Sequence, residues 1–129
     1  MERKISSIEE WENIILTSNT DNLSSILDTD VIFYSPVVFT PQKGKVIVGQ
    51  YLSAAVKVFQ NKQFRYTNII KSNNFTYAEF EAMFGNILVN GIDAIKIKNN
   101  LIIEFKVFIR PLKGIEIVWK EMRESLIRK

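Results

Sequence analysis

The stretch "VNGIDAIKIKNNLIIEFKVFIRP" (residues 89–111) decides the fold, because it has the pattern of two strands joined by a short turn. Apolar residues alternate with lysine and glutamate, and Asn99 and Asn100 interrupt the alternation. Such a pattern is typical of strands with one buried face and one exposed face. One carboxylate, Asp93, lies within it, so the face on which Asp93 sits decides whether it meets solvent or the interior.

The alternation predicts that Asp93 points inward. Lysines occupy even positions of the first strand, and lysine is rarely buried, so the odd positions, which include Asp93, form the inner face. In the second strand the odd positions are all apolar and are also expected inside: Leu101, Ile103, Phe105, Val107 and Ile109. Its even positions are expected outside: Ile102, Glu104, Lys106, Phe108 and Arg110.

The turn length fixes the partner of Asp93. A two-residue turn at 99–100 would place Asp93 opposite Lys106, and a three-residue loop over 98–100 would place it opposite Phe105. Only the longer loop keeps both apolar faces on one side, because a one-residue slip turns a strand over. We therefore predict the three-residue loop. Asp93 then either braces the sheet through hydrogen bonds or lines a cavity and contacts a ligand, with its pKa raised unless it is paired.

The neighbouring segments extend this hairpin into a sheet. Residues 64–71, 75–84, 87–98 and 101–110 form four candidate strands with short connections, which predicts an antiparallel meander. A further short strand is expected at 31–36, where Pro36 stops it.

Helical patterns precede and follow the strands. The first helix begins at Ser6 or Ser7 with a capping-box pattern, and Asp21 or Asn22 can cap a short second helix. A third helix follows a proline- and glycine-containing loop, and its apolar face is Val48, Tyr51, Leu52, Ala55 and Phe59. After the strands, a final helix is expected over 114–127. Helices followed by strands predict an α+β domain, with helices on one face of a curved sheet, spanning 1–129 as a single domain.

Composition excludes several classes of chemistry. The 129 residues contain no cysteine and no histidine, so disulfides, zinc sites of Cys/His type and histidine-based triads cannot form. We expect no metal and no cofactor. The formal charge of +3 comes from mixed charges without a basic, aromatic stripe, so no nucleic-acid partner is expected. No apolar run approaches the ~20 residues of a membrane span, and the acidic N-terminal segment is unlike a signal peptide. We expect no membrane association and a cytoplasmic location.

Four segments carry a resemblance to a known superfamily: "LDTDVIFYSP" (27–36), "TPQKGK" (40–45), "NGIDAIKIK" (90–98) and "IIEFKVFIRPL" (102–112). Their order and spacing resemble the nuclear transport factor 2-like superfamily, which includes ketosteroid isomerases and SnoaL-like polyketide cyclases. The resemblance covers residues 8 to 112. It implies a cone-shaped α+β barrel, here with an extra C-terminal helix.

The steroid isomerases have three polar groups in their pocket. The resemblance assigns one of them to Asp93, which matches an aspartate in an "ID" dipeptide on the penultimate strand. Ser35 stands where these enzymes have a general-base aspartate before a proline, and Trp11 stands where they have a tyrosine on the first helix. A serine without histidine is a poor base, and an indole is only a hydrogen-bond donor. Steroid-isomerase chemistry is therefore not expected.

Two related enzyme classes are also matched incompletely. Phe105 and Val107 occupy the places of a histidine and an aspartate in the cyclases. Limonene-epoxide-hydrolase-like members use an Asp-Arg-Asp set, of which only Asp93 and either Arg65 or Arg110 can be found. No catalytic residue is assigned, and Asp93 is the best candidate.

Three hypotheses follow. In the first, the chain binds a hydrophobic small molecule in an apolar cavity, with Asp93 as the polar anchor. The second is an isomerase, cyclase or epoxide hydrolase using Asp93 as acid, and the third is a homodimeric interaction module with a filled cavity. A cavity above roughly 300 Å³ would favour the first two. The expected ligand-binding residues are Trp11, Phe33, Ser35, Phe39, Tyr51, Asp93, Ile95, Phe105 and Val107.

The outer face of the sheet is the expected dimer interface. It carries large apolar groups among charged ones, which favours burial against a partner. Relatives with the resembling fold commonly pair through this face. We therefore expect a homodimer formed through Ile102, Glu104, Lys106 and Phe108.

Overall fold

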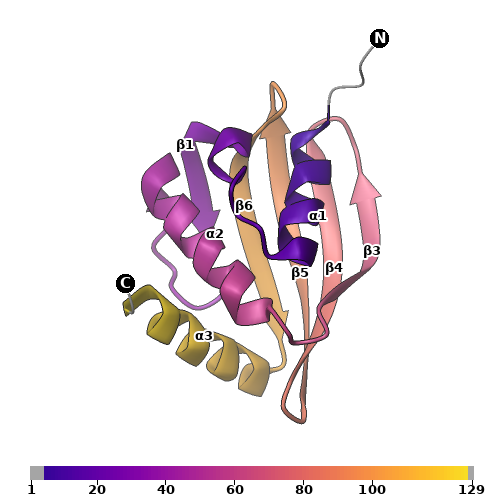
Figure 1. The fold of residues 1–129 in the computed structure, drawn as a ribbon, viewed down its shortest axis with the longest axis vertical. Helices are drawn as coiled ribbons and strands as arrows, with labels where there is room; N and C mark the ends of the chain where they lie inside the picture. Colours follow the sequence, from indigo (N-terminus) through magenta and orange to yellow (C-terminus); the bar gives the residue numbers. More distant parts are fainter. Residues whose placement is uncertain (1–4, 128–129) are drawn as a thin grey trace.

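The computed structural model describes residues 5–127, which form three α-helices and a six-stranded sheet (Figure 1). In chain order the elements are α1 (Ser7–Thr17), the 3-10 turn η1 (Ser24–Ile26), β1 (Leu27–Tyr34), β2 (Gln42–Lys43), α2 (Lys45–Phe59), β3 (Arg65–Lys71), β4 (Phe75–Phe84), β5 (Ile87–Lys98), β6 (Leu101–Arg110) and α3 (Leu112–Ile127).

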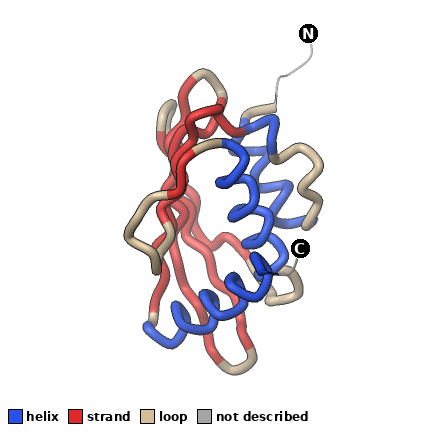
Figure 2. The backbone as a smooth tube through the Cα atoms, turned by 90° about the vertical axis from the view of Figure 1, so that its left-hand side faces the viewer, coloured by secondary structure: helices blue, strands red, loops and turns tan. Residues whose placement is uncertain are grey.

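The sheet is curved and unclosed, and the helices lie on its concave side (Figure 2). Its strand order is β2-β1-β6-β5-β4-β3, with β3 to β6 forming the predicted antiparallel meander. The α+β class and the additional C-terminal helix are confirmed. Two details differ from the expected antiparallel barrel. β1 pairs in parallel with β6, which makes the sheet mixed, and the edges formed by β2 and β3 do not join.

The N-terminal elements follow their local signals in part. The Ser6 side chain accepts a hydrogen bond from the Glu9 backbone N–H, and the Glu9 carboxylate accepts one from the Ser6 N–H, as the capping box predicts. The predicted second helix is only the short turn η1, because Leu27 already begins β1. β1 therefore starts earlier than the predicted strand and ends before Ser35.

The turn between β5 and β6 is shorter than predicted. Lys98 pairs with Leu101, which leaves a two-residue turn, and Asn99 and Asn100 adopt φ angles of 53° and 58°. Asparagine tolerates this left-handed conformation better than most residues, and tight hairpins require it. Asp93 lies opposite Val107 rather than Phe105. The predicted loop was therefore wrong.

A β-bulge in β6 compensates for the short turn. Without it, the apolar residues of β6 would face away from the core. Lys96 pairs with Glu104 and Ile97 pairs with Ile102, so Ile103 is an extra residue in β6. Ile102 consequently faces the core and is 0% exposed, which contradicts its predicted place on the outer face. Beyond the bulge the strand returns to the predicted phase, and Asp93 lies on the inner face as expected.

The other residues predicted on the outer face of the sheet do lie there. Phe108 is 54% exposed and lies opposite Ile92, which is also exposed. The Lys106 ammonium lies 4.7 Å from the centre of the Tyr34 ring. Glu104 pairs with Lys96 at 3.4 Å. Pairing of two copies through this face stays a prediction.

The core fills the space between the concave face and the helices. A Cβ at Gly91 would overlap the Phe80 ring and the Phe108 carbonyl oxygen, so glycine at this position lets Phe80 lie flat on β5, near Asp93. Within residues 5–127, no helix is long and apolar enough to cross a membrane. Over the same residues, no group of three or more carboxylate side chains is placed to hold a metal ion.

Candidate functional site

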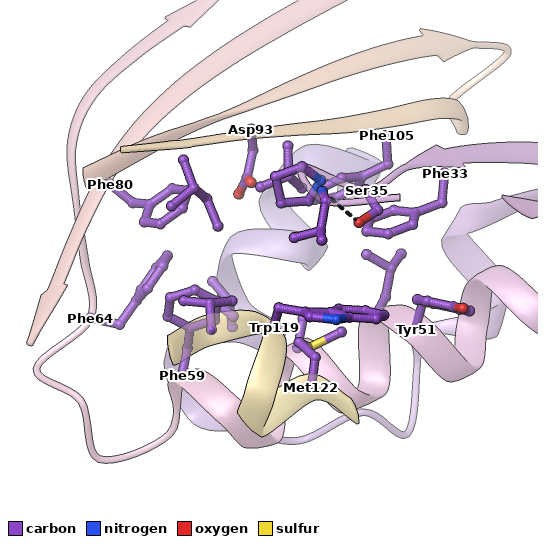
Figure 3. Close-up of a pocket in the computed structure, with 18 of the residues that line it drawn as sticks. Phe33, Ser35, Tyr51, Phe59, Phe64, Phe80, Asp93, Phe105, Trp119 and Met122 are labelled. Atoms are coloured by element: carbon purple, nitrogen blue, oxygen red, sulfur yellow. Dashed lines mark hydrogen bonds between the residues drawn. The ribbon is translucent and has the colours of Figure 1, made fainter. Parts of the chain in front are cut away.

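A small apolar hollow lies between the concave face of the sheet, α2 and α3 (Figure 3). Its volume is about 60 Å³. Aromatic and aliphatic side chains form almost all of the wall, and the polar residues among them are Ser35, Tyr51 and Asp93. The volume is below the roughly 300 Å³ expected of a preformed ligand pocket, so size does not favour the two ligand hypotheses. The placement of polar atoms carries the argument instead.

Asp93 projects from β5 into this hollow and is 6% exposed (Figure 3). Its neighbours across the sheet are Ala78 and Val107, which bring no charge. Burial raises the pKa of the Asp93 carboxyl to about 7, against the opposing effect of a hydrogen bond from Tyr66. The carboxyl therefore exists in both protonation states near neutral pH.

A chain of hydrogen bonds from α1 through β3 ends at Asp93. The Trp11 indole N–H donates to the Tyr66 hydroxyl oxygen at 2.8 Å, and the Tyr66 hydroxyl donates to Asp93 Oδ2 at 2.6 Å. Because an indole can only donate, it directs the Tyr66 proton toward Asp93. Burial and the nearby Asp93 charge raise the pKa of Tyr66 well above its usual range. Oδ2 is thus held as an acceptor, and any proton on the carboxyl belongs on Oδ1.

Within residues 5–127, the second carboxyl oxygen, Oδ1, makes no hydrogen bond. Among the residues that the structure describes, Tyr66 is the only side chain bonded to the Asp93 carboxyl. Oδ1 is also not one of the fully enclosed polar atoms that lack a partner, and Asp93 is among the residues that line the hollow. The site therefore presents one free oxygen to an apolar space.

Solved structures place this architecture among known folds. A steroid delta-isomerase from Pseudomonas aeruginosa superposes with a TM-score of 0.88 and 28% identity, over 94% of this chain and 89% of that chain. A bacterial protein of cystatin-like fold from Silicibacter pomeroyi matches with a TM-score of 0.87 and 23% identity, over 95% of this chain and 86% of that one.

An NTF2-like protein of unknown function from Mesorhizobium loti gives a TM-score of 0.74 at 10% identity, covering 81% of this chain and 88% of its own. The chain has the nuclear transport factor 2-like fold. These neighbours confirm the resemblance in fold that the four sequence segments indicated. No protein-family profile and no curated protein sequence matches the chain.

Most of the predicted ligand-binding residues meet in the hollow of this fold. Edge-on contact joins the rings of Trp11 and Phe105, with centres 5.0 Å apart, and Phe33 lies within 6.2 Å of Phe105 and 5.7 Å of Tyr51. These rings form one continuous wall beside Asp93. The predicted residues that line the hollow are Trp11, Phe33, Ser35, Tyr51, Asp93, Phe105 and Val107.

Two predicted residues lie elsewhere. Phe39 is 98% exposed, because the Ser35 hydroxyl accepts hydrogen bonds from the Val37 and Val38 N–H groups and turns the chain out of the fold before Phe39. Ile95 is 1% exposed but lies in the packed core rather than against the hollow. Phe39 and Ile95 are therefore not part of this site.

Among residues 5–127, Asp93 is the one carboxylate that lines the hollow. Ser35 is engaged with the backbone. Arg65 lies on the outer face, where it pairs with Glu81 at 3.0 Å, and Arg110 is exposed. The Asp-Arg-Asp set of epoxide-hydrolase-like members therefore does not assemble.

Sequence reasoning missed Tyr66, the direct partner of Asp93. The signal was present, because Phe64 and Tyr66 alternate within the candidate strand 64–71 and so share an inner face. Trp119 and Met122 from the last helix also line the hollow and were not among the predicted ligand-binding residues.

Proposed function

We propose that the protein binds a small, mainly apolar molecule carrying one hydrogen-bonding oxygen, and that Asp93 contacts this oxygen. The observation that carries the proposal is the unpartnered Oδ1 of a buried carboxyl in an apolar hollow. A ligand oxygen in this space would form a hydrogen bond with Oδ1, and such a bond typically contributes about 0.5–1.5 kcal/mol net.

The protonation state of Asp93 selects the kind of oxygen. With Oδ2 held by Tyr66, a protonated Asp93 donates from Oδ1 to a carbonyl or ether oxygen. An ionised Asp93 accepts from a hydroxyl group. Because the pKa of Asp93 is about 7, both modes are accessible near neutral pH. The aromatic wall contributes by burying the apolar part of the ligand, at roughly 25 cal/mol per Å².

The likeness to a steroid delta-isomerase supports an apolar ligand with a polar oxygen. It does not extend to catalysis, because Ser35 replaces the base and Phe105 and Val107 replace the acid–base pair of the cyclases. We therefore propose binding without proton transfer. Deuterium exchange from solvent into a bound ketone, catalysed by the protein, would instead reveal an enzyme.

A matched pair of probes tests the proposal. Phenol and toluene have nearly the same shape, but only phenol carries an oxygen. We expect phenol to bind the protein about 10-fold more tightly than toluene, measured by NMR titration, since one such hydrogen bond contributes about 1–2 kcal/mol. Asp93→Leu should abolish this preference, and Glu104→Gln on the outer face should keep it. An equal preference in the wild type and Asp93→Leu would refute the proposal.

We also propose that two copies pair through the outer sheet face formed by Tyr77, Ile92, Glu104, Lys106 and Phe108. Three of these side chains are apolar or aromatic and exposed by 39% or more, which supports burial against a partner. Sedimentation equilibrium should give the mass of a dimer, and Phe108→Glu should shift it to that of a monomer. A monomeric wild type would contradict the pairing. The cytoplasmic location stays a prediction.

A further inference from the structure

One wall of the hollow comes from a single element, α3. Its residues Val118, Trp119 and Met122 close the side opposite the strands that carry Asp93 and Phe105 (Figure 3). The space left is about 60 Å³, the room of a few water molecules at about 10–15 Å³ each. A ligand of more than one ring would therefore need this wall to move.

The two ends of α3 are held differently. At its first turn, Gly114 packs so closely that a Cβ would lie 3.2 Å from Val89 Cγ2 and 3.4 Å from Pro111 Cδ. Further along the helix, surface grooves of about 450 and 530 Å³ are bordered by α2 and α3, and Lys57 and Ser125 line both of them. α3 is thus tightly packed at Gly114 and borders open grooves further along, where Val118 and Met122 still pack into the core.

One polar contact joins α3 to the rest of the fold. Glu121 pairs with Lys62 at 3.1 Å, and the same ammonium donates to the Val58 carbonyl oxygen near the end of α2. In the described part of the chain, no other side-chain hydrogen bond or ion pair links α3 to the remaining elements. The pair is partly exposed, so it is weak and can exchange with water.

We propose that α3 is a movable wall that pivots near Gly114, and that Trp119 leaves the hollow when a ligand of two or more rings binds. This inference rests on the proposed binding function and adds which residues set the size of the ligand. In the closed position Trp119 and Met122 occupy the volume that the second ring requires. The Lys62–Glu121 pair holds this position.

Stopped-flow fluorescence with 2-naphthol tests the pivot. If α3 must open first, the observed binding rate of the wild type reaches a plateau as the 2-naphthol concentration rises. Glu121→Gln should raise that plateau roughly two- to five-fold, as expected for the loss of a weak ion pair. Glu116→Gln is the matched control on the exposed side of the same helix and should leave it unchanged. Phenol, with one ring, should bind without a plateau.

Variants at Trp119 separate the moving wall from a fixed one. Trp119→Ala, or Trp119→Leu if the alanine variant does not fold, makes room for the second ring without movement of α3. In this variant the binding rate should rise linearly with 2-naphthol concentration, and adding Glu121→Gln should not change it. The pivot is overturned if the wild-type rate is already linear and insensitive to Glu121→Gln. It is also overturned if 2-naphthol binds only the Trp119 variants. Failure of phenol to bind would overturn the binding function itself.

Discussion

The two faces of the sheet shift the pKa of a carboxyl group in opposite directions. On the concave face, burial raises the pKa of Asp93 to about 7. On the convex face, hydrogen bonds from Asn90 and Asn68 hold the pKa of Glu79 below its usual range. Asp93 and Glu79 lie on adjacent strands, so the difference comes from the environment rather than from position in the chain. Burial beneath the helices governs the pKa of Asp93, whereas hydrogen bonds from neighbouring strand residues govern that of Glu79.

The aromatic residues show the same contrast in packing. Phe80 on the concave face is 1% exposed and touches Phe59, Phe64 and Tyr66. Phe108 on the convex face is 54% exposed. Substitutions at Phe80 and Phe108 should therefore differ most strongly in their effect on the free energy of unfolding.

The largest expected effect is that of Phe80→Ala. Removing a fully buried ring leaves a cavity, so we expect a loss of about 3–5 kcal/mol in the free energy of unfolding, measured by urea denaturation. Phe108→Ala is the control and should lose less than about 1 kcal/mol in the monomer. Equal losses would mean that the concave face is not the core.

The next largest effect is a pH dependence. The folded-state pKa of Asp93, about 7, lies above the unfolded value of about 3.9, so the folded state binds the proton more tightly. Asp93 therefore makes its full contribution to the free energy of unfolding below pH 4. That free energy should fall by about 4 kcal/mol as the pH rises from 4 to 7.

Asp93→Asn cannot ionise and should lack this loss. Its free energy of unfolding should rise relative to that of the wild type between pH 4 and pH 8. The control Glu104→Gln, on the convex face, should follow the wild type. Parallel profiles for Asp93→Asn and the wild type would show that Asp93 is solvated.

Tyr66→Phe should have an intermediate effect. It removes the donor to Asp93 and the acceptor for the Trp11 indole, at a cost of about 1–3 kcal/mol. Because the Tyr66 hydrogen bond lowers the pKa of Asp93, its loss should move that pKa further upward. Tyr77→Phe, at an exposed tyrosine of the convex face, should change stability by less than about 0.5 kcal/mol. If Tyr66→Phe left both the stability and the pKa of Asp93 unchanged, the hydrogen bonds from Trp11 through Tyr66 to Asp93 would be contradicted.

The smallest effect is expected from the convex ion pairs. In the single chain Lys96 and Glu104 lie 3.4 Å apart and both are partly exposed, so Glu104→Gln should cost the monomer no more than about 1 kcal/mol, measured at a protein concentration too low for pairing. The cost should shrink in 1 M salt, where exposed charges are screened. A larger loss that salt does not reduce would indicate that this face is buried in an assembly.

The strands were predictable because their alternation is long. Segments 75–84, 87–98 and 101–110 have the predicted bounds. The inward direction of Asp93 also followed from the lysines beside it. The bulge at Ile103 did not, because "LII" at 101–103 is apolar at every position and carries no information on phase. The pattern alone could not show that a short turn and an extra residue compensate each other.

The site was less predictable than the fold, because it depends on contacts between distant segments. Tyr66 meets Asp93 only through the pairing of β3, β4 and β5, and Trp11 reaches Tyr66 from α1. Phe39 looked like a wall residue by composition, but the turn after Ser35 carries it outward. The small volume of the hollow depends on how α3 packs, which local patterns do not specify.

The most direct test of the account is a carbon-13 NMR titration of the Asp93 side-chain carboxyl, without and with phenol. We expect a midpoint near pH 7 for the free protein and a displaced midpoint when phenol occupies the hollow. A midpoint near pH 4 that phenol does not move would contradict it.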